Sequence, residues 1–380
     1  MALVALSFAL HLYIGARIVT SFPGALGATL FALLLVASAL FVPLGLFARR
    51  IARPPASDAL AWIGLLFLGL FSSLLVLTVL RDLVLLAVWL FDLAAPARLP
   101  MQPVRIGSAG AVPVLGLAIT ALGFLNARRI APAVKVDIAL DDLPDALQGL
   151  RIAQLSDIHV GPTIKAPYLR RIVQAVNALQ PDVIAITGDL VDGPVAELKA
   201  HVAPLAELRA RHGVFFVTGN HEYYSGVEPW LRELGTLGIR VLMNEHVLVR
   251  HRGATLVLAG IPDYSAGRYA HAHQPDPVAA LRGAPAHAPR VLLAHQPRSA
   301  PGAQAAGFDL QLSGHTHGGQ FLPWNFFVPL QQPYTAGLHR VGRMWLYVSR
   351  GTGYWGPPKR FGAPSEITLL QLVRSRRPAS

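Results

Sequence analysis

The hydrophobic positions of the chain follow two different patterns, which meet near Arg128. Before that residue, apolar residues form long runs with few charges, and four such runs cover residues 3–19, 25–47, 60–80 and 107–125. Each run supplies about 17–25 residues, the length of an α-helix that crosses ~30 Å of hydrocarbon. The first run has no basic start and three more runs follow it, so we interpret it as a span rather than a cleaved signal peptide. The pattern predicts a transmembrane region of about four helices over residues 1–127.

The third run can be interpreted in two ways, because Arg81 and Asp82 interrupt its continuation over residues 60–93. One long helix with an interfacial Arg–Asp pair gives four spans, whereas two shorter spans would give five. With four spans, the arginines of residues 49–53 and the basic residues after the last span lie on the same side of the membrane. Positively charged loops tend to remain cytoplasmic. We prefer the single helix, which places the rest of the chain in the cytoplasm; two spans would place it outside.

After Arg128 the apolar runs become short, and five of them end in a small residue followed by a polar one. The stretches are LRIAQLSDIH, DVIAITGDLVDG, GVFFVTGNHEYY, RVLLAHQP and FDLQLSGHTHGGQ, and their apolar parts are typical of buried strands. Helical spacing in YLRRIVQAVNALQ predicts a helix between the first two strands. A second helix is expected over residues 195–211, with a kink or a break at Pro204. Polar groups that follow the carboxyl ends of strands gather in one crevice, so we expect the five stretches to share one site.

The polar residues of these stretches supply oxygen and nitrogen donors but no sulfur, because the chain contains no cysteine. Carboxylates, an amide and imidazoles suit Mn²⁺, Fe or Zn²⁺. Seven donors exceed the needs of one tetrahedral ion, and they match two ions if one carboxylate bridges them. The candidate metal-ligating residues are Asp157, His159, Asp189, Asn220, His295, His315 and His317. Because His315 and His317 are one residue apart in a glycine-rich loop, their imidazoles can reach different ions.

The order of these motifs, D-x-H, G-D-x-x-D, G-N-H-E, H and G-H-x-H, resembles that of the calcineurin-like metallophosphoesterases. The resemblance covers residues 150–372, and its details are similar to the bacterial branch of membrane-associated, phosphodiesterase-like proteins. It implies an α/β metallophosphoesterase catalytic domain over residues 150–373, with two packed β-sheets flanked by helices (αββα). A linker and first strand over residues 128–149 would precede this domain, and a basic tail over residues 374–380 would follow it. The expected fold class is therefore an N-terminal all-α transmembrane bundle joined to this domain.

Carried over to this sequence, the resemblance implies a role for each donor. One ion would be held by Asp157, His159, Asp189 and His317, and the other by Asp189, Asn220, His295 and His315, so that Asp189 bridges them. A hydroxide shared by the two ions would attack phosphorus, and His221 would act catalytically by protonating the leaving oxygen. Glu222 would either orient His221 or serve as a loop carboxylate.

The resemblance leaves the residue that binds the phosphate group unassigned. Protein serine/threonine phosphatases of this superfamily carry an arginine where this chain has Gly193, which argues against a phosphoprotein substrate. Arg350 is a candidate for substrate binding, and a surface or structural arginine is the alternative. Three aromatic residues after the last motif would either form a lipid-facing wall near the site or pack in the core: Trp324, Phe326 and Phe327.

The sequence therefore predicts a membrane-anchored, metal-dependent phosphoric ester hydrolase that acts on phosphodiester or diphosphate bonds. Its substrate would be either a lipid or lipid-linked phosphoester, which the spans bring close, or a soluble phosphodiester. The alternatives are a metal-binding sensor and a transporter with a non-catalytic domain; the presence of His221 argues against the first, and the scarcity of polar residues in the spans argues against the second.

The net charge of +12 does not indicate a nucleic-acid partner, because the basic residues are scattered and several flank the spans. We expect the lipid bilayer and a phosphoester substrate as partners, and no oligomeric state is indicated. The predicted location is the bacterial inner membrane, with the catalytic domain on the cytoplasmic side.

Overall fold

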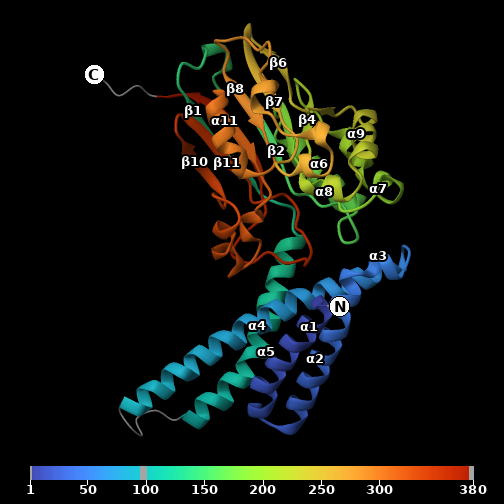
Figure 1. Cartoon of the computed structure of the whole chain (residues 1–380), viewed down its shortest axis with the longest axis vertical. Helices are drawn as coiled ribbons and strands as arrows, with labels where there is room; N and C mark the ends of the chain where they lie inside the picture. Colours follow the sequence, from blue (N-terminus) through green and yellow to red (C-terminus); the bar gives the residue numbers. More distant parts are fainter. Residues whose placement is uncertain (1, 95–100, 376–380) are drawn as a thin grey trace. The chain divides into compact units, whose positions relative to one another are not determined.

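The computed structural model describes residues 2–94 and 101–375. The chain divides into two compact units, which are drawn in Figure 1. The first comprises Met1–Arg128 with Gly356–Phe361, and the second comprises Arg129–Trp355 with Gly362–Ser380. Most of the predicted basic tail, residues 376–380, lies outside the described residues.

The first unit is a helical bundle (Figure 1). Its elements are α1 (Ala2–Ile18), α2 (Ala25–Leu46), the short α3 (Ala48–Ile51), α4 (Ala56–Ala94) and α5 (Met101–Arg128). The four long helices are each long and apolar enough to cross a membrane. A continuous helix satisfies its own backbone hydrogen bonds, and this is required in hydrocarbon because the lipid tails offer no hydrogen-bond partners. The prediction of four apolar helices is confirmed.

Residues 60–93 lie within one helix, since α4 is continuous over 39 residues. At 1.5 Å per residue its length is about 58 Å, which exceeds the thickness of the hydrocarbon core. The charge of Arg81 does not break the helix, because its guanidinium is buried and donates to Ser108 Oγ at 3.0 Å and to the carbonyl oxygen of Arg105 at 3.1 Å. The single-helix interpretation is therefore confirmed.

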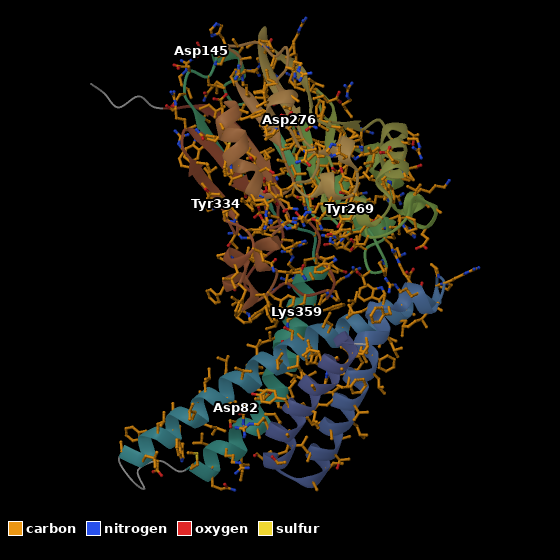
Figure 2. The ribbon with its side chains drawn as sticks, in the orientation of Figure 1. Asp82, Asp145, Tyr269, Asp276, Tyr334 and Lys359 are labelled. Carbon is orange, nitrogen blue, oxygen red and sulfur yellow. The ribbon has the colours of Figure 1, made fainter. Side chains whose placement is uncertain are left out.

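Two features of the first unit depend on close backbone contacts. Helices α2 and α4 meet at Gly45 and Gly64, where a Cβ on Gly45 would lie 2.5 Å from the Cα of Gly64. The segment Gly356–Phe361 also belongs to this unit, although it is far away in sequence. Within the segment, Lys359, labelled in Figure 2, donates from Nζ to the carbonyl oxygen of Gly69 at 2.9 Å. No periodic pattern in the sequence indicates this placement.

The second unit contains two six-stranded mixed sheets. The order in the first sheet is β1 (Ala133–Leu140), β12 (Ile367–Arg374), β2 (Arg151–Leu155), β3 (Val183–Thr187), β4 (Val214–Val217) and β5 (Arg240–Val241). The order in the second sheet is β10 (Gly337–Val341), β11 (Met344–Val348), β9 (Leu310–Ser313), β8 (Arg290–Leu293), β7 (Ala254–Gly260) and β6 (Glu245–His251). Inner residues of both sheets, such as Ile152 and Leu258, share one buried hydrophobic core. The prediction of two packed sheets is confirmed.

Six short helices accompany the sheets: α6 (Ala166–Ala178), α7 (Val195–Val202), α8 (Asn220–Tyr224), α9 (Val227–Thr236), α10 (Pro277–Ala280) and α11 (Ala300–Ala306). Helix α6 connects the parallel strands β2 and β3, as its apolar spacing predicts, and buries Leu169, Ile172, Val173 and Val176. Helix α11 packs its alanines against the second sheet. The predicted helix over residues 195–211 is shorter and in two pieces: α7 is followed by a tighter 3₁₀ turn over Ala203–Glu207, which contains Pro204, and residues 208–211 are not helical.

The strand directions decide where polar residues gather. Strands β2, β3 and β4 run parallel to one another, and so do β7, β8 and β9. Their carboxyl ends therefore lie along one edge of each sheet. All five predicted polar stretches follow these ends.

Candidate metal centre

The predicted metal-ligating residues come from five loops, which follow β2, β3, β4, β8 and β9. The structure gathers the acidic and histidine side chains into three overlapping groups, in each of which the ligand atoms lie within 4.8 Å of one another. The groups are Asp157 with His159 and His317, His159 with Asp189 and His221, and Asp189 with His295 and His315. Residues that lie up to about 160 positions apart in sequence thus meet in one place.

The first group is built around two facing imidazoles. His159 Nε2 lies 3.1 Å from His317 Nε2, and His317 Nε2 lies 3.4 Å from Asp157 Oδ1. All three residues are buried. Two nitrogens and one carboxylate oxygen therefore point at one small volume, as the ligands of a divalent ion do.

The third group, Asp189 with His295 and His315, shares Asp189 with the second group. Asp189 Oδ2 lies 3.1 Å from His295 Nε2 and 3.9 Å from His159 Nε2, so its carboxylate stands between the two sets of imidazoles. His315 Nδ1 lies 3.2 Å from His295 Nε2. Burial, together with the neighbouring His295, lowers the pKa of His315 to about 3, which keeps its imidazole neutral and its lone pair available. His315 and His317 thus belong to different groups.

Asn220 provides an independent test of whether this site suits a cation. Its side-chain oxygen Oδ1 is buried and has no hydrogen-bond partner among the residues that the structure describes. Leaving a buried acceptor unsatisfied costs about 1–3 kcal/mol. A cation bound by Asn220 would satisfy this oxygen, and the donor set contains only the oxygen and nitrogen atoms that Mn²⁺, Fe and Zn²⁺ accept. The residues present therefore fit a metal ion.

Partners behind the imidazoles fix which nitrogen faces the site. His295 Nδ1 lies 2.7 Å from the carbonyl oxygen of Thr187, and His159 Nδ1 lies 2.9 Å from Asp192 Oδ1. Each Nδ1–H therefore donates outward, and Nε2 keeps its lone pair for the centre. Histidines that bind metals are almost always held in this way.

The backbone at these loops is held in a sparsely populated conformation. Five of the seven predicted ligands have φ between 51° and 72°, a range that non-glycine residues rarely adopt: Asp157, His159, Asp189, His315 and His317. The chains also approach closely, since a Cβ on Gly314 would lie 2.2 Å from Asp157 Oδ2 and one on Gly219 would lie 2.2 Å from Asp189 Oδ1. Strain of this kind clusters at functional sites, where the surrounding structure maintains it.

His221, the predicted catalytic residue, lies at the exposed side of the centre. Its Nδ1 lies 2.7 Å from Asp192 Oδ1, and its Nε2 lies 3.9 Å from Asp189 Oδ2. Burial lowers the pKa of His221, but the carboxylates of Asp189 and Asp192 outweigh that effect and raise it to about 9. A protonated imidazole with Nε2 directed toward the donor groups can give a proton to a bound oxygen.

Asp192 is absent from the predicted ligand set, and the structure gives it a clear position. Its Oδ1 accepts from Nδ1 of both His159 and His221. These two histidines outweigh burial and hold the pKa of Asp192 well below its usual range. The only sequence signal for it is the second aspartate of the G-D-x-x-D stretch.

Glu222 does not orient His221 through any hydrogen bond in the described part of the chain. Its carboxylate is fully buried and accepts from the backbone N–H groups of Gly219, Asp189, Leu190 and Val191 at 2.6–3.3 Å. Burial and the nearby Asp189 raise the pKa of Glu222 to about 8. Of the two predicted roles, the loop carboxylate is the one that its contacts match, because Glu222 ties together the loops that carry Asp189 and Asn220.

Arg350, the candidate for substrate binding, is engaged elsewhere. Its Nη1 lies 3.0 Å from Glu366 Oε2, and its side chain is 37% exposed. Its Cγ lies beside Gly318, where a Cβ would be 3.0 Å away. The ion pair matches the structural alternative, although the residue borders the loop of His317.

Exposed aromatic and apolar residues border the centre. The rings of Tyr224 and Trp355 lie 5.1 and 5.5 Å from that of His221, and Tyr269, labelled in Figure 2, lies 5.7 Å from Tyr224. Of the three residues with two predicted environments, Phe326 and Phe327 are 72% and 51% exposed and Trp324 is 41% exposed. The alternative prediction that these three residues pack in the core is therefore wrong.

Comparisons with known proteins agree with the motifs. A family model described as calcineurin-like phosphoesterase matches residues 150–319. A zebrafish (Danio rerio) protein named transmembrane protein with metallophosphoesterase domain is 42% identical over 274 residues, which cover 69% of this chain and 63% of the relative. An uncharacterized metallophosphoesterase of Campylobacter jejuni is 35% identical over 261 residues, which cover 68% of each chain.

The match to relatives and solved structures is partial in extent. The chain spans about 60% of the length of the first curated relatives that it matches. Among solved structures, the phosphopantetheinyl hydrolase of Mycobacterium tuberculosis matches 62% of this chain and 99% of its own, with a TM-score of 0.39 and 13% identity.

Proposed function

The chain belongs to the calcineurin-like phosphoesterase family, and from this premise we propose that it is a membrane-anchored, metal-dependent hydrolase of phosphodiester or diphosphate bonds. The observation that carries the proposal is the convergence of two donor groups on the shared carboxylate of Asp189. One ion would be held by Asp157, His159, Asp189 and His317, and the other by Asp189, Asn220, His295 and His315. Divalent ions bound there, Mn²⁺, Fe or Zn²⁺, polarise a phosphoryl oxygen and make water nucleophilic at neutral pH.

His221 supplies the proton for the leaving oxygen. Asp192 holds its Nδ1 at 2.7 Å, so the ring cannot turn away, and Nε2 faces the donor groups. General acid catalysis of this kind contributes about 10²–10⁴ in rate. The exposed rings of Tyr224 and Trp355 border the same side of His221, where the departing part of the substrate leaves.

The substrate is a phosphoester carried by a lipid. Residues 318–338 contain no charged side chain, and they follow the ligand loop of His317 directly. Five large apolar residues in this segment are 41–81% exposed: Leu322, Trp324, Phe326, Phe327 and Leu330. The segment folds back beside its own start, two residues after His317, since a Cβ on Gly319 would lie 2.2 Å from the Cα of Asn325. Clustered exposed apolar residues favour a membrane or ligand contact, and a chain with four apolar helices has a bilayer at hand.

The protein is located in the bacterial inner membrane with the second unit in the cytoplasm. The support is the distribution of arginines around the spans, which favours cytoplasmic loops between α2 and α4 and after α5. Because the chain has no cysteine, a single cysteine at the exposed Val278 can report the side. A membrane-impermeant maleimide should label it only after cells are opened; labelling in intact cells would contradict this orientation.

The activity is tested with full-length protein in detergent micelles, supplied in turn with Mn²⁺, Fe²⁺ and Zn²⁺. The substrates are an aryl phosphodiester, a micellar phospholipid analogue and its water-soluble short-chain form. We expect metal-dependent turnover that Asp189→Ala abolishes, with the micellar form preferred. Phe326→Ser should lower turnover of the micellar form while leaving that of the short-chain form unchanged.

A different result would contradict each part of the proposal. Metal binding without turnover of any phosphoester would indicate a sensor or a non-catalytic domain. Equal turnover of the micellar and short-chain forms would overturn the lipid substrate and leave the hydrolase intact.

A further inference from the structure

One end of the helical unit holds an arginine cluster that the proposed hydrolase does not use. Arg17 lies in the last turn of α1, Arg81 lies inside α4, and Arg105 lies near the start of α5. All three line one cavity of about 340 Å³. Since charged residues in spans are expensive, their convergence from three helices favours a functional reason.

The cluster carries more positive than negative charge. Asp82 is its carboxylate partner, and it accepts from Arg17 Nε at 2.8 Å and from Tyr13 Oη at 2.7 Å. Arg81 Nη1 lies further from Asp82, at 3.5 Å. Three guanidinium groups therefore face one carboxylate, and none of the described residues that line the cavity carries a carboxylate. The described residues leave a surplus of two positive charges at this position.

The guanidinium groups are held in place and still have donors to offer. Arg105 Nε donates to Ser21 Oγ at 2.9 Å, and Arg81 Nε donates to Ser108 Oγ at 3.0 Å. In the part of the chain that the structure describes, no hydrogen bond occupies the two Nη groups of Arg105. Each guanidinium has five N–H donors in a planar fork, which matches the oxygens of a phosphate group.

The remaining wall of the cavity is apolar. Leu85, Trp89 and Met101 line it, next to the arginines. The combination of fixed cations on one side and apolar side chains on the other matches a phosphate that carries hydrocarbon. Tryptophan is enriched at the level of lipid headgroups, and basic pockets between spans bind headgroups of anionic lipids.

The position along the helices matches the depth of a headgroup. Helix α5 is 28 residues long, about 42 Å, and Arg105 lies near its beginning, at the opposite end from Arg128. Arg17 ends the span of α1 on the same side as Arg105. Asp82, labelled in Figure 2, marks this cluster in the helical unit.

We propose that this cavity binds the phosphate headgroup of an anionic glycerophospholipid at the membrane face opposite to the Arg128 end of α5. The phosphate oxygens accept from Arg81 and Arg105, and the first methylenes of the lipid contact Trp89 and Met101. The lipid headgroup and free phosphate present the same oxyanion to the arginines. The apolar wall of the cavity favours the lipid. The site does not depend on the proposed hydrolase, so an Asp189→Ala protein should bind the lipid equally well.

The test is native mass spectrometry of delipidated full-length protein titrated with three probes: dihexanoyl phosphatidylglycerol, dihexanoyl phosphatidylcholine and inorganic phosphate. We expect one phosphatidylglycerol to bind at least roughly tenfold more tightly than either other probe. Arg105→Gln should lower that affinity roughly tenfold or more. Arg50→Gln, which removes one positive charge beyond the other end of α2, should not change it.

Three results would overturn the proposal. If phosphatidylcholine bound equally well, the site would not be selective for an anionic headgroup. If inorganic phosphate bound equally well, the site would not be selective for a lipid. Equal effects of Arg105→Gln and Arg50→Gln would place the binding elsewhere. An unchanged melting temperature and retained phosphoesterase activity of Arg105→Gln would show that the site is lost and the fold is not. Arg17→Gln, at a partly exposed side chain, is the milder second variant.

Discussion

Replacing Asp192 by asparagine tests the link between the metal-binding groups and the proposed proton donor. One carboxylate oxygen, Oδ1, accepts from Nδ1 of His159 at 2.9 Å and from Nδ1 of His221 at 2.7 Å. Asparagine has the same shape but no charge. Hydrogen bonds to charged groups contribute about 1.5–3 kcal/mol and neutral ones about 0.5–1.5 kcal/mol, so the substitution loses about 1–1.5 kcal/mol per bond. The side chain of Asp192 is 21% exposed, so solvent screens these bonds only in part.

The two losses together predict a decrease in kcat of about 30- to 150-fold, since 1.36 kcal/mol corresponds to tenfold. Initial rates on an aryl phosphodiester, with Mn²⁺ at saturation, measure the decrease. Asp182→Asn is the matched control, because Asp182 is also largely buried and accepts a backbone bond from Arg151 at 2.9 Å, before rather than after β3. The reasoning fails if Asp192→Asn keeps kcat within threefold of the wild type while its melting temperature is unchanged.

Four further outcomes follow from the same geometry. Gly314→Ala places a Cβ 2.2 Å from Asp157 Oδ2, so the metal affinity measured by titration calorimetry should fall roughly 10- to 100-fold. Gly235→Ala, where a Cβ meets nothing within 4 Å, is the control and should leave that affinity unchanged. Glu222→Ala strips the acceptor from four buried backbone N–H groups and should lower the free energy of unfolding by more than about 2 kcal/mol in urea titrations; a loss below 0.5 kcal/mol (about the noise of such data) would contradict it. Asn220→Ala should reduce bound metal from two ions to one by elemental analysis, and two remaining ions would exclude Asn220 as a ligand. A chelator should abolish turnover and lower the melting temperature, both restored by Mn²⁺; unchanged melting would mean that no ion stabilises the native fold.

The parts of this fold that could be predicted from sequence are those in which one local pattern has one physical meaning. A long uncharged run must be a helix in hydrocarbon, and a short apolar run that ends in Gly-Asp or Gly-Asn is a buried strand with a polar loop. For that reason the four long helices, the strands of the five motifs and α6 agree with expectation. The break before Pro204 follows from its missing N–H.

What sequence could not supply depends on contacts between distant residues. No local pattern around the second aspartate of G-D-x-x-D indicates its role, because Asp192 meets the imidazoles of His159 and His221 only in the folded loops. Glu222 follows His221 directly, yet the turn of α8 directs it to backbone N–H groups instead. Short or polar edge strands such as β5 and β10 lack a strong apolar pattern. Residues Gly356–Phe361 join the helical unit through several hydrogen bonds between distant residues, which no periodicity encodes.

The most direct test of the central claim is the anomalous scattering of manganese in crystals of the full-length protein grown with Mn²⁺. Two peaks about 3.5–4 Å apart are expected, with Asp189 between them, His317 beside one and His315 beside the other. A single peak, or peaks away from these side chains, would contradict the two-ion centre on which the proposed hydrolysis rests.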